Sequence, residues 1–183
     1  MSILDRMLER AASRPVAIEP MRARHVGQVM VIERLAYPKP WTAQVFHDEL
    51  RETRVGRRAY FVARRGGHVL GYGGLMFVAD RTGAEGHITN IAVHPDERRS
   101  GIATRLLLAL AKVTVVRGCS AWTLEVRATS TGAQQLYRKF GFVPAGIRRD
   151  YYENSTDAIV MWCHDIQSDD YARRLAALER GEA

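Results

Sequence analysis

The chain has few cysteines, no long apolar run and no repeated or low-complexity segment. Two cysteines in 183 residues give neither a disulfide framework nor the spacing of a zinc site. The longest aliphatic run, residues 106–111, is far shorter than the roughly 20 residues of a membrane-spanning helix. The first residues lack the apolar core of a signal peptide. We therefore expect a cytoplasmic protein that works without a membrane and without a metal.

The overall composition is that of one folded domain with a basic surface. Hydrophobic residues make up 46% and charged residues 26% of the chain. The net charge of +7 indicates an anionic ligand, either nucleic acid or a phosphate-bearing cofactor. The arginines occur in scattered pairs and form no single basic stripe. Charge alone therefore does not favour nucleic acid, and we do not expect nucleic acid to be required.

Residues 87–110 are the stretch around which the chain is organised. A buried strand over 88–93 ends at a proline, a basic turn follows over 96–101, and an apolar helix begins at about residue 102. A glycine turn that leads into a helix N-terminus directs several backbone N–H groups at one point, which is typical of a phosphate site. The alternative is an ordinary strand, turn and helix whose arginines are only solvated.

Hydrophobic periodicity, turn residues and caps predict the remaining elements. We expect helices over 1–14, 24–35, from 43 to about 50, 131–140 and 169–180, and strands over 15–20, 59–65, 68–78, 121–127, 142–147 and 157–164. A polar loop is expected over 80–86, and Thr131 with Gln134 has the spacing of a capping box. The order strand, helix, strand, helix in the middle requires one parallel pair with a right-handed crossover. The fold class is therefore mixed α/β around one sheet, with the other strands antiparallel.

Glu125 is the first candidate for chemistry. In the strand 121–127 a period of two places Glu125 on the same face as Arg127. This strand should be central in the sheet and covered on both of its faces, so Glu125 is a carboxylate where burial is expected. Such a carboxylate is either functional or half of a structural ion pair with Arg127. Tyr137 lies in a helix, where tyrosine is usually a core residue. His87 and His94 lack metal-ligand spacing, and we assign both to structural or surface roles.

The residues Arg98-Arg99-Ser100-Gly101-Ile102-Ala103 resemble the acyl-CoA pyrophosphate loop of the GNAT acetyltransferases, whose pattern is Gln/Arg-x-x-Gly-x-Gly/Ala. The resemblance continues in order through Leu124-Glu125-Val126-Arg127, then Leu136-Tyr137 to Gly141-Phe142, and Ile147-Arg148-Arg149-Asp150-Tyr151-Tyr152. This series is similar to the RimI branch, N-terminal acetyltransferases that act on a small-subunit ribosomal protein. It covers about residues 15–166 and leaves a helical extension (1–14) and a helical tail (167–183) outside.

The resemblance implies the GNAT fold, a mixed and mostly antiparallel sheet with a splayed parallel strand pair, flanked by helices. It also implies acetyl-CoA as co-substrate. The residues expected to contact acetyl-CoA are Ile91, Ala92, Val93, Arg98, Arg99, Ser100, Gly101, Ile102, Ala103, Ser130 and Tyr137. Among them the backbone N–H of Val93 would stabilise the thioester oxyanion. Ser130 stands where the family usually has asparagine; it can still form a hydrogen bond, but its shorter side chain reaches less far toward the CoA arm.

The resemblance further implies how the acetyl group is transferred. Glu125 matches the family's general base, acting through water, and Tyr137 matches the general acid that protonates the CoA thiolate. The residues expected around the acceptor are Tyr37, Trp41, Asn90, Glu125, Tyr151 and Tyr152. The two cysteines lie outside the matched segments, so a covalent acetyl-cysteine is not expected.

The hypothesis that follows is acetyl transfer to the α-amine of an N-terminal residue, an alanine of a ribosomal protein, by direct attack. Alternatives are a lysine side chain, a polyamine or another small amine as acceptor. A non-catalytic acyl-CoA-binding or ribosome-associated module is a further alternative. A nucleic-acid binder is the last, and no feature of the sequence other than the net charge supports it. Neither the breadth of acceptors nor the oligomeric state follows from the sequence.

Overall fold

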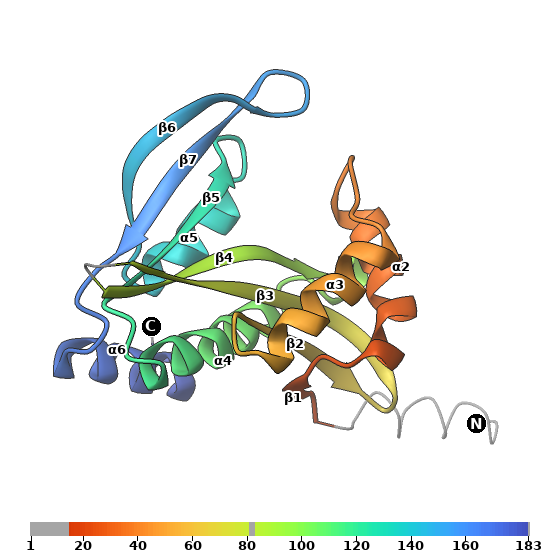
Figure 1. The fold of residues 1–183 in the computed structure, drawn as a ribbon, viewed down its shortest axis with the longest axis horizontal. Coiled ribbons are helices and arrows are strands. Elements are labelled where there is room, and N and C mark those ends of the chain that lie inside the picture. Colours follow the sequence, from red (N-terminus) through yellow and green to blue (C-terminus); the bar gives the residue numbers. More distant parts are fainter. Residues whose placement is uncertain (1–14, 81–82, 183) are drawn as a thin grey trace.

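A computed structural model describes residues 15–80 and 83–182 (Figure 1). The helix predicted for residues 1–14 lies outside these described residues. Within these described residues, seven strands form one sheet in the order β1-β2-β3-β4-β5-β7-β6. The strands are β1 (Ala17–Pro20), β2 (Arg58–Arg65), β3 (His68–Asp80), β4 (Gly83–Val93), β5 (Ala121–Arg127), β6 (Val143–Tyr152) and β7 (Thr156–Cys163). Among the strands that the structure describes, β4 and β5 alone pair in parallel, which confirms the predicted mixed sheet with a single parallel pair.

The helices surround this sheet. They are η1 (Ala23–His25), α2 (Val26–Ala36), α3 (Ala43–Arg54), η2 (Pro95–Glu97), α4 (Ile102–Val116), α5 (Thr131–Lys139) and α6 (Asp169–Arg180). The side chain of Thr42 accepts a hydrogen bond from Val45 N–H and so caps the start of α3. In the part of the chain that the structure describes, no helix is long and apolar enough to cross a membrane.

Alternate residues of β2 contact different helices, which defines two layers on the first half of the sheet. Tyr60 and Val62 join the core cluster formed with α2 and Phe46 of α3. Phe61 and Ala63 pack with residues of α4 on the opposite face. Figure 1 shows α2 and α3 on one side of β2, β3 and β4, and α4 on the other. This half of the sheet is therefore covered on both faces.

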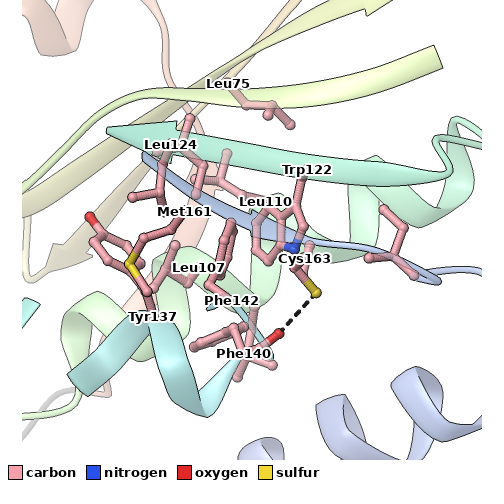
Figure 2. Packing of buried hydrophobic residues seen from close by; sticks show 14 of the residues in the cluster. Leu75, Leu107, Leu110, Trp122, Leu124, Tyr137, Phe140, Phe142, Met161 and Cys163 are labelled. Carbon is pink, nitrogen blue, oxygen red and sulfur yellow. Dashed lines mark hydrogen bonds between the residues drawn. The ribbon is translucent and has the colours of Figure 1, made fainter. Parts of the chain in front are cut away.

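The second half of the sheet, β5, β7 and β6, packs on α5 through an aromatic cluster. The Trp122 ring of β5 lies 4.7 Å from that of Phe142 and 6.1 Å from that of Phe140. Figure 2 shows these rings together with Leu124 and Met161 in the core between α5 and the strands. The same core includes Tyr171, Leu175 and Leu178 of α6.

The loop predicted over 80–86 is wrong. β3 extends to Asp80 and β4 begins at Gly83, with Phe77 opposite Gly86 and Asp80 opposite Gly83 in the ladder. The polar and glycine residues of this segment favoured a loop, but the hydrogen bonds of a long hairpin outweigh weak strand preferences.

Candidate active site

β4 and β5 pair over three residues only and then separate. Their parallel register ends with His87 opposite Thr123. A β-bulge also interrupts β4, because its pairing with β3 passes from Asn90 to Ile88 and leaves Thr89 without a partner residue. Figure 1 shows the two strands diverging beyond this point. The expected splayed parallel pair is therefore present.

A cavity of about 440 Å³ opens where the strands diverge. Its walls come from the diverging parts of β4 and β5, from α5, from the turn after α2 and from the β6–β7 hairpin. It brings together nine of the residues predicted from the sequence: Tyr37, Trp41, Asn90, Ile91, Glu125, Ser130, Tyr137, Tyr151 and Tyr152. These residues come from well-separated parts of the chain, so only the tertiary fold brings them to one cavity. No group of His, Cys, Asp and Glu within the described residues could hold a metal ion.

Glu125 lies in this cavity with its side chain only 9% exposed. Its carboxylate is 3.2 Å from Nε2 of His87 and 3.3 Å from the guanidinium of Arg148. The alternative of an ion pair with Arg127 is wrong, because Arg127 bonds to Glu153 instead. Although Arg127 shares a face with Glu125, the β6–β7 hairpin offers it a closer carboxylate. The Glu125 carboxylate thus lies in the cavity and contacts one histidine and one half-exposed arginine.

His87 is a site residue that the sequence analysis missed. It lines the cavity beside Glu125, contrary to the structural or surface role assigned to it. Burial lowers its pKa, the Glu125 carboxylate raises it, and Arg148 lowers it further, with a net downward shift. The imidazole is therefore neutral near pH 7. No signal in the sequence marked this role, because the bulge two residues further along β4 and the divergence of the strands cannot be seen in a strand pattern.

Tyr137 of α5 is 6% exposed and its ring packs edge-on against that of Phe142 at 5.8 Å. Figure 2 shows its hydroxyl pointing away from the Phe140 and Phe142 rings. The hydroxyl makes no hydrogen bond to another residue in the described ranges. Burial raises the pKa of Tyr137 far above its usual value, and the nearby Tyr37 and Tyr152 raise it further. The phenol therefore keeps its proton and can act as a donor.

Some backbone groups of β4 point away from β3, toward the side on which the cavity lies. His94 N–H donates to Leu70 C=O on β3 at 2.8 Å. Because neighbouring residues of an antiparallel strand point their amides in opposite directions, the N–H of Val93 points away from β3. Ile91, two residues before Val93, has the same orientation. Its C=O accepts a hydrogen bond from the Tyr37 hydroxyl at 2.8 Å, so it is not paired with β3. The N–H of Val93 thus faces the side from which β5 has diverged.

The predicted phosphate loop, residues 98–103, lies at the start of α4 and does not line the cavity. Gly101 is the N-cap of α4 with φ +78°, and Arg99 also has a positive φ of 65°. No atom lies within 4 Å of the position that a Cβ on Gly101 would take, so an approaching group has room there. Arg65 holds the preceding residue Glu97 by an ion pair of 2.9 Å. The side chain of Ile102 is buried in the core.

Aromatic residues form the outer part of the cavity. The Tyr152 hydroxyl donates to Glu125 C=O at 3.1 Å, and its ring lies 4.2 Å from the Arg127 guanidinium. Burial raises the pKa of Tyr152 to about 12. Tyr151 is 48% exposed at the rim. The amide nitrogen of Asn90 is buried and has no hydrogen-bond partner among the described residues, so it is available to a ligand.

Ser130 is the N-cap residue of α5, but its side chain makes no capping hydrogen bond. The capping box predicted for Thr131 and Gln134 is wrong, since Thr131 is already helical. The Gln134 side chain instead donates to the carbonyls of Arg127 and Ala128, which close the end of β5. The Ser130 hydroxyl is therefore left for a group in the cavity that it lines.

The chain was compared with protein families, with related sequences and with solved structures. Residues 26–142 match the sequence profile of the acetyltransferase (GNAT) family. A Bacillus subtilis protein, provisionally named a [ribosomal protein bS18]-alanine N-acetyltransferase, is 35% identical over 147 residues, which are 80% of this chain and 93% of that protein.

Two solved structures are similar as well. The ribosomal-protein-S18-alanine N-acetyltransferase from Escherichia coli superposes with a TM-score of 0.72 at 30% identity, over 82% of this chain and 94% of that one. Arabidopsis thaliana NAA60 in complex with acetyl-CoA has a TM-score of 0.72 over 82% of this chain and 98% of its own, at 18% identity. The second likeness concerns the fold alone.

Proposed function

This chain belongs to the GNAT acetyltransferase family, and from that premise we propose that it transfers the acetyl group of acetyl-CoA to the α-amine of a protein N-terminus. The observation that carries the proposal is the divergence of β4 and β5, which leaves an unpaired side of β4 beside a cavity holding both Glu125 and Tyr137. We assign the reaction to residues 15–166.

The N–H of Val93 stabilises the thioester carbonyl as the amine attacks. The attack forms the N–C bond and places negative charge on the carbonyl oxygen. A donor that points away from β3 is available for this charge without breaking the ladder. The pantetheine arm lies along the same edge of β4, past Ile91 and Ala92.

Glu125 removes the proton that blocks the attack. An α-amine has a pKa near 8, so most of it is protonated at neutral pH and cannot act as a nucleophile. The buried carboxylate accepts this proton, directly or through a water molecule. The pKa of His87 beside it is lowered, so this imidazole is neutral near pH 7 and adds no positive charge next to the carboxylate.

Tyr137 completes the transfer when the C–S bond breaks. The leaving thiolate takes the phenol proton, and the nitrogen gives up its second proton to solvent as the tetrahedral intermediate collapses to the amide. After release the tyrosinate recovers a proton from solvent, and Glu125 returns to solvent the proton that it took from the amine. Its raised pKa keeps the phenol protonated until then. The products are the acetylated amine and free CoA, and no covalent acetyl-enzyme forms.

The start of α4 holds the pyrophosphate. The N–H groups of residues 99–103, the helix dipole and the open space around Gly101 fit an anion, and the two exposed arginines, Arg98 and Arg99, add positive charge. The N–H of Arg98 itself donates to Pro95 C=O. Ser130 contacts the CoA arm with its uncapped hydroxyl. These contacts concern the co-substrate and not the acceptor.

The acceptor is the N-terminal segment of another protein, and we propose an alanine of a ribosomal protein, acetylated in the cytoplasm. The relatives named above for this activity support the choice. The acceptor lies between Tyr37 and Trp41 on one side and Tyr151 and Tyr152 on the other, with Asn90 donating to its backbone. Neither a membrane nor nucleic acid takes part in the reaction.

The test is CoA release from acetyl-CoA in the presence of peptides that differ only in their first residues. We expect turnover with an alanine-ended peptide and none when its α-amine is blocked while an internal lysine stays free. Turnover of the blocked peptide would mean that the acceptor is a lysine side chain. Turnover of a small amine but of no peptide would mean that the acceptor is a small molecule.

A further inference from the structure

Glu33 is a buried carboxylate that neither the fold nor the acetyl transfer described above explains. It lies in α2, is 2% exposed and belongs to the wall of the cavity. Burial raises its pKa, and it forms no ion pair within residues 15–80 and 83–182. An acidic side chain in such a place costs stability compared with an apolar one, unless its oxygens are used.

Both ends of the turn between α2 and α3 are attached to Glu33. Its backbone C=O accepts Tyr37 N–H at 3.0 Å, and its side-chain Oε1 accepts Trp41 N–H at 2.8 Å. Pro38 and Pro40 have no N–H of their own. Glu33 thus binds two of the three N–H groups that the turn of residues 37–41 possesses.

The second carboxylate oxygen connects this turn to the core. Oε2 of Glu33 accepts the hydroxyl of Tyr72 from β3. The ring of Tyr72 packs edge-on against Phe46 at 5.5 Å, and Phe46 packs against Trp41 at 5.5 Å. The four side chains Glu33, Trp41, Phe46 and Tyr72 therefore form a closed circuit, the Glu33 circuit, that holds Trp41 by its backbone and by its ring.

The same turn also reaches the diverging strand. The Tyr37 hydroxyl donates to Ile91 C=O on β4, so the turn is tied to the site at a third point. Three residues of the turn, Tyr37, Lys39 and Trp41, line the cavity. A turn held in this way presents its aromatic side chains in one arrangement before any peptide arrives.

We propose that Glu33 is a positioning residue for the acceptor: it holds Tyr37 and Trp41 in the geometry that binds the incoming N-terminus. This inference rests on the proposed function. Glu33 acts through the turn and touches neither the acetyl group nor the CoA. Its loss therefore weakens acceptor binding and leaves acetyl-CoA binding unchanged.

The experiment compares Glu33→Ala, Glu33→Gln and Tyr72→Phe with Leu175→Ala, a core change in α6 that lowers stability away from the turn. We expect Glu33→Ala to raise the peptide KM about tenfold or more, with the KM for acetyl-CoA within about twofold. Glu33→Gln keeps an oxygen for Trp41 N–H and should stay within about threefold of the wild type. Tyr72→Phe should change the peptide KM in the same direction by a smaller factor.

Equal changes in both KM values, or the same pattern in Leu175→Ala, would overturn the proposal. A glutamine variant as impaired as the alanine variant would overturn it too, because charge and not the hydrogen bond would then be responsible. Hydrogen–deuterium exchange of residues 37–42 gives a readout without turnover, and it should quicken in Glu33→Ala but not in Leu175→Ala. Unchanged exchange refutes the positioning role, whereas a wild type inactive on every peptide refutes the proposed function.

Discussion

The two ends of the candidate site are built in different ways. The phosphate end consists of six consecutive residues, 98–103, at the start of one helix. The acceptor end combines side chains from the turn after α2, from β4, from β5, from α5 and from the β6–β7 hairpin. The phosphate end needs only the local backbone shape of one turn. The acceptor end needs several distant segments to meet where β4 and β5 diverge.

This difference predicts two separable kinetic effects. Backbone N–H groups and a helix dipole make the phosphate end, so its changes should alter the KM for acetyl-CoA. Buried side chains make the acceptor end, so its changes should alter kcat or the peptide KM. Mutations at each end test whether the two effects are separate.

The largest effect is expected for Glu125→Gln at the acceptor end. An amide cannot take the proton of the amine, so kcat should fall about 100-fold or more. The KM for acetyl-CoA should stay nearly constant, because Glu125 lies away from the phosphate loop. Steady-state kinetics with saturating peptide measures both quantities.

A matched control for this change is Glu52→Gln, which removes a carboxylate paired with Arg57 outside the cavity. It should retain full activity. If Glu125→Gln were as active as this control, Glu125 would not be the base.

Gly101→Ala tests the phosphate end. A side chain at φ +78° costs about 1 kcal/mol and places a Cβ where the pyrophosphate would approach. We expect the KM for acetyl-CoA to rise about tenfold, with little change in the peptide KM. Gly118→Ala is the control: it lies beyond the other end of α4, with φ +70° and equally open surroundings. It should lose similar stability in denaturant unfolding but keep its kinetics, and equal kinetics in both variants would argue against the phosphate assignment.

His87 adds a pH dependence that belongs to the acceptor end. Its pKa in the folded protein lies below the ordinary 6.5, so the unfolded chain binds this proton more tightly. Stability that is present above pH 6.5 is therefore lost as the pH falls toward the lowered value. His87→Asn should lose less stability than the wild type between about pH 7.5 and about pH 5.5 in denaturant unfolding. The shifted His25 is present in both proteins and cancels, so identical pH profiles would contradict the lowered pKa of His87.

The smallest effect is expected for Ser130→Asn, which restores the longer side chain usual in the family. Asparagine is as good an N-cap as serine, so stability should hardly change. The longer amide should lower the KM for acetyl-CoA about two- to fivefold, measured against Ser130→Ala, which should raise it slightly. An unchanged KM in both variants would mean that this position makes no contact with the CoA arm.

Most elements could be predicted because their signals are local. The strand 121–127 and the helix 169–180 have the predicted bounds, since strict alternation, capping residues and breaker residues mark them. The predicted loop over 80–86 failed because cross-strand hydrogen bonds, which no local pattern reports, extend both strands of the hairpin. The capping box at Thr131 failed because Gln134 found backbone acceptors at the end of β5.

The chemical candidates were visible in the sequence, but their partners were not. Glu125 could be selected as a carboxylate in a covered strand, whereas its actual neighbours, His87 and Arg148, come from two other strands. Glu33 gave no signal, because a glutamate in an amphipathic helix is ordinary until the packing buries it. Its role depends on Tyr72, which lies 39 residues further along the chain.

By itself the sequence determined the mixed sheet with one parallel pair, the glycine turn that begins α4 and the residue types available for acid–base chemistry. These follow from periodicity, conformational preference and side-chain chemistry, which act over a few residues. Only the tertiary structure decided where β4 and β5 part, which charges face Glu125 and how Glu33 is hydrogen-bonded to the turn of residues 37–41. Those features depend on burial and on contacts between distant segments, and such contacts form only when the whole chain has packed.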